Sequence, residues 1–130
     1  MTRPIVVCDD ANPSTIIGLH GGVGATEWKG FMPAISMSAC CESFATLRVT
    51  PGAAIGEHRH GEAEEVYFVV SGTGIVTQDG TAVEVVPGDL VMTKAGQPHS
   101  IANNDDEDLH LVVVRATPHK HIDEHGGRAT

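Results

Sequence analysis

Hydrophobic and polar residues alternate along much of the middle of the chain. Ala45, Leu47 and Val49 fall on one side of the segment 45–50, and the residues between them are polar. This period of two is that of a half-buried β-strand. Similar short runs follow at residues 66–70, 75–78, 81–86, 90–94 and 109–116. Because hardly any segment shows helical periodicity, the chain is predicted to be all-β, with its strands in a closed antiparallel arrangement.

Turn-forming residues separate these runs. Asp79-Gly80 lies between two of them and predicts a two-residue hairpin. The dipeptide Pro51-Gly52 and the segments 87–89 and 95–98 mark further breaks. Each break restarts the alternation, so the runs are predicted to be separate short strands.

Length and composition fit a single domain. We divide the 130 residues into an N-terminal arm with leading strands (1–44), a barrel core (45–116) and a disordered tail (117–130). The formal net charge of −9 argues against a nucleic-acid partner. No apolar run approaches the ~20 residues that span a bilayer, and the first residues do not resemble a signal peptide. We therefore expect a cytoplasmic protein without a membrane partner.

Potential metal ligands surround the most strand-like run. His58 and His60 are two apart, so a strand would present both imidazoles on one face. A carboxylate follows at Glu64 or Glu65, which a strand would place on opposite faces, and His99 lies in a second turn-rich segment. A lone strand histidine is usually structural, but three imidazoles facing one cavity are costly to bury without a cation. Imidazole with carboxylate is a typical ligand set for divalent transition metals.

The spacing of these residues resembles that of the two cupin motifs. The first motif, G-x5-H-x-H-x4-E-x6-G, is matched by Gly52, His58, His60, Glu65 and Gly72. The second, G-x5-P-x-G-x2-H-x3-N, is matched by Gly88, Gly96, His99 and Asn103, with Lys94 in place of the proline. Motif spacing also selects Glu65 over Glu64. The chain therefore resembles a small single-domain cupin over roughly residues 45–116.

The resemblance implies a fold, a cofactor and an assembly. Cupins are double-stranded antiparallel jelly-roll β-barrels that hold one divalent metal ion, here Fe, Zn, Mn, Ni or Cu. The implied metal ligands are His58, His60, Glu65 and His99. Four protein ligands on an octahedral ion leave two positions for water, dioxygen or a small-molecule substrate. Similarity to small cupins also implies a homodimer, for which Trp28 and Phe31 are candidate contact residues.

The resemblance implies a metal-dependent enzyme without selecting its reaction, because cupins include dioxygenases, isomerases, decarboxylases, lyases and cyclases. We predict an enzyme of specialised metabolism that acts on an oxygenated small molecule by Lewis-acid or oxygen chemistry. The segment 20–24, HGGVG, resembles the leader of small bacterial cupins, some of which are fused to synthetase-like modules that build nitrogen–nitrogen bonds. The alternative is a module that binds a small ligand or a metal without turnover.

Two further residues are candidates for catalysis. Tyr67 shares the strand parity of Glu65 and is a candidate proton donor, although a strand tyrosine is more often packed in the core. Lys94 shares parity with the apolar Met92, which predicts an inward position where its cation would attract an anionic substrate. The alternative for Lys94 is a side chain that reaches solvent.

The glycine-rich segment, the adjacent cysteines and the histidines of the tail each have both a structural and a functional interpretation. Glycines at 18, 21, 22 and 24 suggest a phosphate loop, but their order is not G-x-G-x-x-G and a turn is predicted. Cys40 and Cys41 are interpreted as small apolar residues in or beside a strand, with an active-site thiol as the alternative. The histidines of the tail would bind metal only adventitiously.

Overall fold

The computed structural model describes residues 13–31, 40–118, 121–122 and 128–129, and most of them lie in β-strands. Six strands form one sheet: β1 (Ser14–Ile17), β2 (Ala25–Gly30), β3 (Cys41–Val49), β5 (Glu64–Ser71), β8 (Leu90–Thr93) and β10 (Leu109–Ala116). Four strands form a second sheet: β4 (Ala54–His58), β6 (Gly74–Gln78), β7 (Thr81–Val85) and β9 (His99–Ala102). A short 3-10 turn, Leu19–Gly21, connects β1 to β2.

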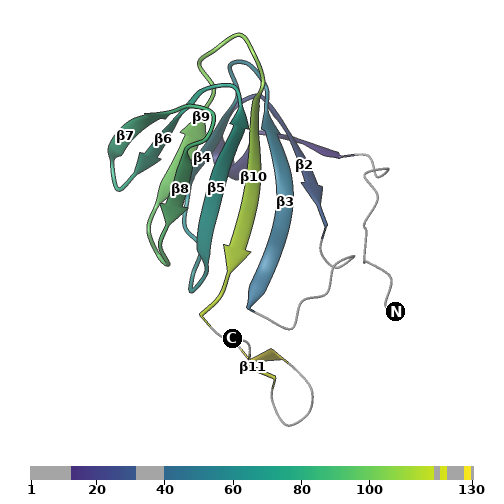
Figure 1. Cartoon of the computed structure of the whole chain (residues 1–130), viewed down its shortest axis with the longest axis vertical. Coiled ribbons are helices and arrows are strands. Elements are labelled where there is room, and N and C mark those ends of the chain that lie inside the picture. Colours follow the sequence, from purple (N-terminus) through teal and green to yellow (C-terminus); the bar gives the residue numbers. More distant parts are fainter. Residues whose placement is uncertain (1–12, 32–39, 119–120, 123–127, 130) are drawn as a thin grey trace.

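The two sheets are the two layers of a jelly roll. The larger sheet has the order β1-β2-β3-β10-β5-β8 and the smaller one β4-β9-β6-β7, with neighbouring strands antiparallel in both. Figure 1 shows β10 running between β3 and β5, with β4, β9, β6 and β7 in the other layer. The predicted all-β, double-stranded antiparallel jelly-roll fold is confirmed.

The predicted hairpin at Asp79-Gly80 is also confirmed. β6 and β7 pair with Gln78 opposite Thr81. Both turn residues have a positive φ, 48° at Asp79 and 79° at Gly80. This is the backbone of a type I′ turn, which Asp-Gly favours because glycine adopts positive φ without steric cost.

The core lies between the two sheets. The alternation over residues 45–49 correctly predicts the buried face of β3, where Ala45, Leu47 and Val49 are at most 3% exposed. The neighbouring strand β10 contributes every second residue to the same core. Removing these apolar side chains from water is the main term that stabilises the fold.

The outer face of the larger sheet is also apolar. We call its exposed large side chains the outer patch: Phe44, Phe68, Val70, Leu90 and Met92. Part of the patch lies on one strand pair, because Phe68 lies opposite Leu90 in the β5–β8 ladder and Met92 lies opposite Val66. The larger sheet thus carries apolar residues on both faces.

The ends of the chain add little to this architecture. β11 (His121–Ile122) and β12 (Arg128–Ala129) pair with each other in the tail. The first twelve residues, with the apolar triplet 5–7, and most of the tail histidines lie outside the described residues. The division of the chain at residues 44 and 116 and the disorder of the tail stay predictions.

Candidate metal centre

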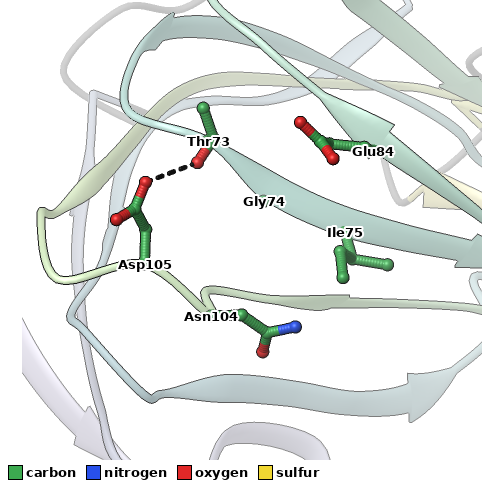
Figure 2. Close-up of a pocket in the computed structure, with 6 residues that line it drawn as sticks. All are labelled: Thr73, Gly74, Ile75, Glu84, Asn104 and Asp105. Carbon is green, nitrogen blue, oxygen red and sulfur yellow. Dashed lines mark hydrogen bonds between the residues drawn. The ribbon is translucent and has the colours of Figure 1, made fainter.

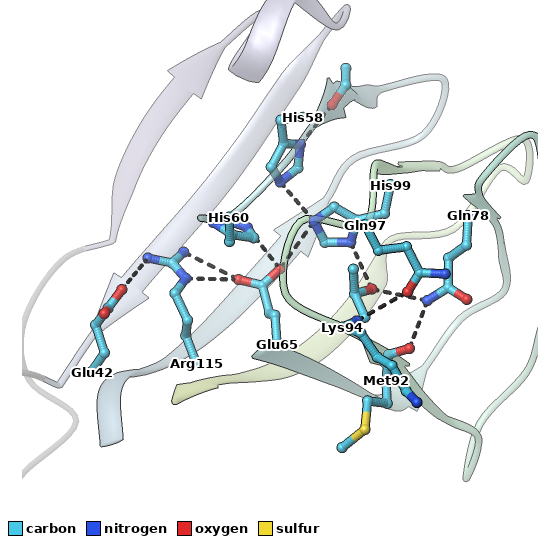
Figure 3. Close-up of polar contacts among 12 residues, drawn as sticks. Glu42, His58, His60, Glu65, Gln78, Met92, Lys94, Gln97, His99 and Arg115 are labelled. Carbon is cyan, nitrogen blue, oxygen red and sulfur yellow. Dashed lines mark hydrogen bonds and ion pairs between the residues drawn. The ribbon is translucent and has the colours of Figure 1, made fainter. Parts of the chain in front are cut away.

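Four potential ligands from three strands and one loop meet between the two sheets. Each of His58, His60, Glu65 and His99 offers a ligand atom within 4.8 Å of the others. His58 ends β4 and lies opposite His99 at the start of β9. Glu65 projects inward from β5, and Figure 3 shows the carboxylate and the imidazoles pointing toward one another. Parity correctly separates the two carboxylates, because Glu65 is 3% exposed whereas Glu64 faces solvent.

The donor atoms fit a cation. Nε2 of His58 lies 2.9 Å from Nε2 of His99. Oε1 of Glu65 lies 3.4 Å from Nε2 of His60 and 3.5 Å from Nε2 of His99. Nε2 of His60 and Oε1 of Glu65 are buried and have no hydrogen-bond partner among the described residues. Buried lone pairs left without partners are expensive, and a divalent ion between them would satisfy them.

Hydrogen bonds behind the imidazoles set their orientation. Nδ1 of His58 lies 2.8 Å from the carbonyl oxygen of Gly56, to which it donates its proton, so Nε2 keeps a lone pair. Nδ1 of His99 lies 3.0 Å from Oγ1 of Thr93, which also accepts a hydrogen bond from Nε2 of Gln78. The metal-binding form of His99 donates its Nδ1 proton to Thr93. Partners of this kind orient metal-ligating histidines.

The electrostatics of the site favour neutral imidazoles. Burial lowers the pKa values of His58 and His60 below the usual 6.5. Burial and the neighbouring His58 lower the pKa of His99 to about 4. A neutral imidazole is the form that binds a metal ion, so the cluster is ready to accept one at neutral pH.

Arg115 fixes the carboxylate. It lies opposite Glu65 in the β5–β10 ladder, and its Nε and Nη2 donate to Oε2 of Glu65 at 3.2 and 3.1 Å. Its Nη1 lies 3.6 Å from Oε1 of Glu42. Because Arg115 occupies Oε2, the other oxygen of Glu65 is left to face the histidines, as Figure 3 shows. The charge pair thus orients Glu65 as a one-oxygen ligand.

A small cavity opens beside the cluster. Its volume is about 30 Å³, and its polar lining consists of His20, His58, His60, Glu65, Tyr67 and Arg115. Its apolar lining consists of Leu19, Trp28, Leu47 and Ile55. This volume holds about two water-sized groups, since one water needs at least ~10–15 Å³. Anything that binds there must be small or must displace part of the lining.

Tyr67 lies in the cavity wall, as its parity predicts. It is 4% exposed, and its ring stacks on that of His99 at a centroid distance of 5.6 Å. Burial and the neighbouring Glu65 raise the pKa of Tyr67 well above 10, so the phenol keeps its proton at neutral pH. Tyr67 therefore packs in the core and borders the site, and its role as a proton donor stays a prediction.

The inward position predicted for Lys94 is wrong. Within β8 the buried side chain is Thr93, at 3% exposure, whereas Met92 is 49% exposed and Lys94 faces solvent. Figure 3 shows the Lys94 side chain extending away from His99. Apolar Met92 does not mark the inner face, because the outer face of this sheet is apolar as well.

The structure also gives the positions of the cysteines, the tryptophan and the glycine-rich segment. Cys40 and Cys41 are half-buried free thiols at the start of β3, and neither lines the cavity. Trp28 packs against the core and lines the cavity, and a contact of Trp28 with a second subunit stays a prediction. The glycine-rich segment 18–24 is a turn, as predicted.

Sequence reasoning missed three residues of the site: His20, Thr93 and Arg115. Arg115 could have been found as the cross-strand partner of a buried carboxylate, since the two face each other in register. Thr93 would have followed from the correct parity of β8. No hydrophobic periodicity in the sequence predicts the position of His20, because it lies in a turn that packs against a strand distant in sequence.

A larger hollow lies apart from the metal ligands. Figure 2 shows residues that line it, from Thr73–Ile75, Glu84 and the loop at Asn104 and Asp105. Its volume is about 160 Å³. Its Thr73 hydroxyl donates to Asp105 at 2.9 Å. The hollow contains carboxylates and no histidine or thiol, so it offers neither a nucleophile nor a metal-ligand set of the kind found between the sheets.

Comparisons with known proteins agree with this geometry. The sequence profile of the cupin domain family matches residues 45–115, and the chain belongs to that family. It is 29% identical over 113 residues to the oxalate-binding protein of Thermotoga maritima, covering 87% of this chain and 93% of that one.

Solved structures give the same result. A predicted oxalate decarboxylase of Thermotoga maritima superposes with a TM-score of 0.81 at 28% identity, covering 88% of this chain and 99% of that one. A cupin 2 conserved barrel domain protein of Salinispora arenicola gives a TM-score of 0.71 at 23% identity, with 91% and 92% covered, and supports the fold alone. Within the described residues no helix is long and apolar enough to cross a membrane.

Proposed function

We propose that this protein is a metal-dependent cupin enzyme that acts on a small oxygenated molecule, a carboxylate or an enolate, bound at its metal ion. The observation that carries the proposal is the convergence of four ligand atoms within 4.8 Å, two of them buried without partners, beside a cavity of about 30 Å³. The ligand residues are His58, His60, Glu65 and His99.

The bound ion would supply Lewis-acid or oxygen chemistry to a coordinated substrate. The protein's own residues do the rest. Arg115 holds Glu65 in place, and Thr93 orients His99. Tyr67 keeps a proton that it can share with a bound oxyanion. The apolar side chains at Trp28 lower the polarity of the cavity wall, which strengthens the polar contacts beside it.

The size and polarity of the cavity support a small anionic substrate. The oxalate-binding relative and the predicted oxalate decarboxylase from Thermotoga maritima point to the same chemical class, since oxalate is a two-carbon dicarboxylate. Metal ions bind such a ligand through two oxygens, and an ion held by the four protein ligands would have room for both. Specialised metabolism stays our proposal for its setting.

A binding protein without turnover is the second candidate. The name of the oxalate-binding relative, which is similar over most of both chains, describes binding rather than catalysis. The solvent-facing Lys94 also removes one charged group from the catalytic set that the sequence suggested. For this candidate the ion would hold the ligand and no bond would change.

We propose a homodimer as the working assembly. The outer patch places five large apolar side chains, each 38–60% exposed, on one sheet face. Exposed apolar areas of this kind mark contact surfaces. The patch therefore joins Trp28 and Phe31 as a candidate contact surface.

Metal loading followed by isotope-labelled turnover tests the function. Protein stripped of metal and reloaded with Mn²⁺, Fe²⁺, Zn²⁺, Ni²⁺ or Cu²⁺ would be incubated with ¹³C-oxalate and a panel of hydroxy and keto acids, with and without dioxygen. An enzyme gives a new ¹³C signal that requires the ion and is lost in Glu65→Gln. Saturable binding with no product under all conditions would favour the binding protein, and neither binding nor product would refute a carboxylate-directed function.

A further inference from the structure

The turn between β1 and β2 brings a fourth histidine to the metal ligands' side. The ring of His20 stacks on that of His58, with centroids 3.8 Å apart and planes 12° from parallel. His20 also lines the cavity that contains His60 and Glu65. It is exposed on its other side, so it forms part of the outer wall of the site.

The backbone of His20 is held in an unfavourable conformation. Its φ and ψ are 52° and 37°, in the left-handed region, which is sterically unfavourable for a residue with a side chain. Among the described non-glycine residues only Asp79, in the hairpin turn, shares a positive φ. Strain of this kind persists where the surrounding structure enforces it, and it is concentrated at functional sites.

Packing against β4 enforces the conformation. Val23 and Ala54 exchange backbone hydrogen bonds of 3.0 and 2.8 Å. A Cβ atom on Gly22 would lie 1.9 Å from the carbonyl oxygen of Ala54, and one on Gly56 would lie 2.0 Å from that of His20. The turn can approach β4 this closely only because both positions are glycine. The glycine-rich pattern therefore serves to hold His20 in place.

The chemistry of the cavity leaves His20 free to act on a ligand. Three of the polar residues in the lining are metal ligands, and Arg115 is bound to Glu65. No described residue forms a hydrogen bond with the ring of His20, whose contact is the stack on His58. A molecule bound at the ion fills a space of about 30 Å³ and must touch this wall.

We propose that His20 is a specificity-determining residue that donates a hydrogen bond from its ring N–H to an oxygen of the metal-bound carboxylate. This inference rests on the proposed function, since it needs an anionic ligand at the ion. His20 selects ligands that present an oxyanion toward the turn, whereas the four metal ligands select for the ion itself.

The test is oxalate binding to the Mn²⁺-loaded protein, measured by calorimetry. His20→Phe keeps a flat ring on His58 and removes the N–H donor. Loss of a hydrogen bond to a charged group should weaken oxalate binding about ten- to a hundredfold while the Mn²⁺ content stays unchanged. His110→Phe is the matched control, because His110 lies on the outward side of β10. The oxalate affinity of this variant should stay within twofold of that of the parent.

The outcomes are separable. Equal oxalate affinity in parent and His20→Phe overturns the role of His20 and leaves the proposed function standing. Loss of Mn²⁺ from His20→Phe also overturns it, since His20 would then support the metal site rather than contact the ligand. A Mn²⁺-loaded parent that does not bind oxalate refutes the proposed carboxylate ligand, and this inference with it.

Chemical modification gives a second measurement on the unaltered protein. Diethyl pyrocarbonate modifies exposed imidazoles, and peptide mapping by mass spectrometry distinguishes His20 from His110. Oxalate should slow the modification of His20 at least severalfold in the Mn²⁺-loaded protein and leave that of His110 unchanged. An unchanged rate at His20 under saturating oxalate would contradict the contact.

Discussion

The two faces of β5 differ in polarity and in burial: one borders the metal ligands and the other belongs to the outer patch. On the inner face, Glu65 and Tyr67 are 3% and 4% exposed and border the metal ligands. On the outer face, Phe68 and Val70 are 41% and 52% exposed and belong to the apolar outer patch. On this strand a carboxylate is thus buried while two large apolar side chains are exposed, which reverses the usual preference of each residue type.

The reversal has a physical cause on each side. A buried carboxylate is tolerated inside because Arg115 pairs with one of its oxygens and an ion would satisfy the other. Apolar residues are tolerated outside if another surface covers them, which a second subunit would do. The difference teaches that hydrophobicity alone does not identify the inner face of this sheet.

Replacing Glu65 and its neighbour Glu64 in turn should give the largest difference in metal affinity between the two faces of β5. Glu65→Gln should weaken metal binding by about a hundredfold or more, because changes even behind the direct ligands typically cost 10–100-fold. Glu64→Gln, one residue earlier on the opposite face, should leave metal affinity unchanged. Competition with a metal-binding dye measures both, and equal effects would contradict the assignment of faces.

A charge on the outer face should affect assembly and nothing else. Phe68→Asp places a carboxylate in the middle of the outer patch and should convert a dimer of 13.6 kDa chains into monomers. Phe68→Leu is the control that keeps the surface apolar. Light scattering at several concentrations gives the mass, and elemental analysis should give the same metal content for all three proteins. A parent that is monomeric throughout would refute the dimer.

Acid should destabilise the metal-free protein because of the buried histidine His99. The pKa of His99 is lowered to about 4 from the 6.5 expected in the unfolded chain. Between these values the unfolded chain binds a proton that the folded chain does not. The free energy of unfolding should therefore fall as the pH drops from 7 to 4, by on the order of 3 kcal/mol for this group.

Denaturant titrations of the metal-stripped protein at several pH values measure this effect. His99→Gln removes the largest of these pKa shifts and should reduce the pH dependence, leaving the smaller part due to His58 and His60, whereas His110→Gln on the outer face should leave it unchanged. A free energy of unfolding that is constant between pH 7 and pH 4 would contradict the burial of neutral His99.

The smallest effect is expected at Lys94. Because its side chain faces solvent, Lys94→Met should leave metal content, oxalate affinity and turnover within twofold of the parent. A tenfold loss of oxalate affinity with the metal content unchanged would show that Lys94 reaches the bound ligand after all.

Local patterns predicted most of this molecule. Alternation predicted the strands, Asp79-Gly80 predicted the hairpin, and the spacing of four side chains predicted the residues that meet between the sheets. All of these depend on residues near one another in sequence or on fixed motif distances. They also include the choice of Glu65 over its neighbour, because strand parity places the two on opposite faces and motif spacing selects Glu65.

The rest depended on packing between distant segments. The face of β8 was assigned wrongly, because Met92 is apolar on an apolar outer surface. Arg115 reaches Glu65 only through the pairing of β5 with β10. His20 reaches the site because two glycines let its turn press against β4. No local period encodes these contacts.

Metal content of the parent and of His99→Ala tests the central claim most directly. Both proteins would be stripped, exposed to a slight excess of one divalent ion, freed of unbound ion and analysed for metal and protein. We predict one ion per chain in the parent and almost none in His99→Ala, because the removed imidazole lies within 4.8 Å of the other three ligands. One ion per chain in His99→Ala, or none in the parent with any of the five metals, would contradict the account.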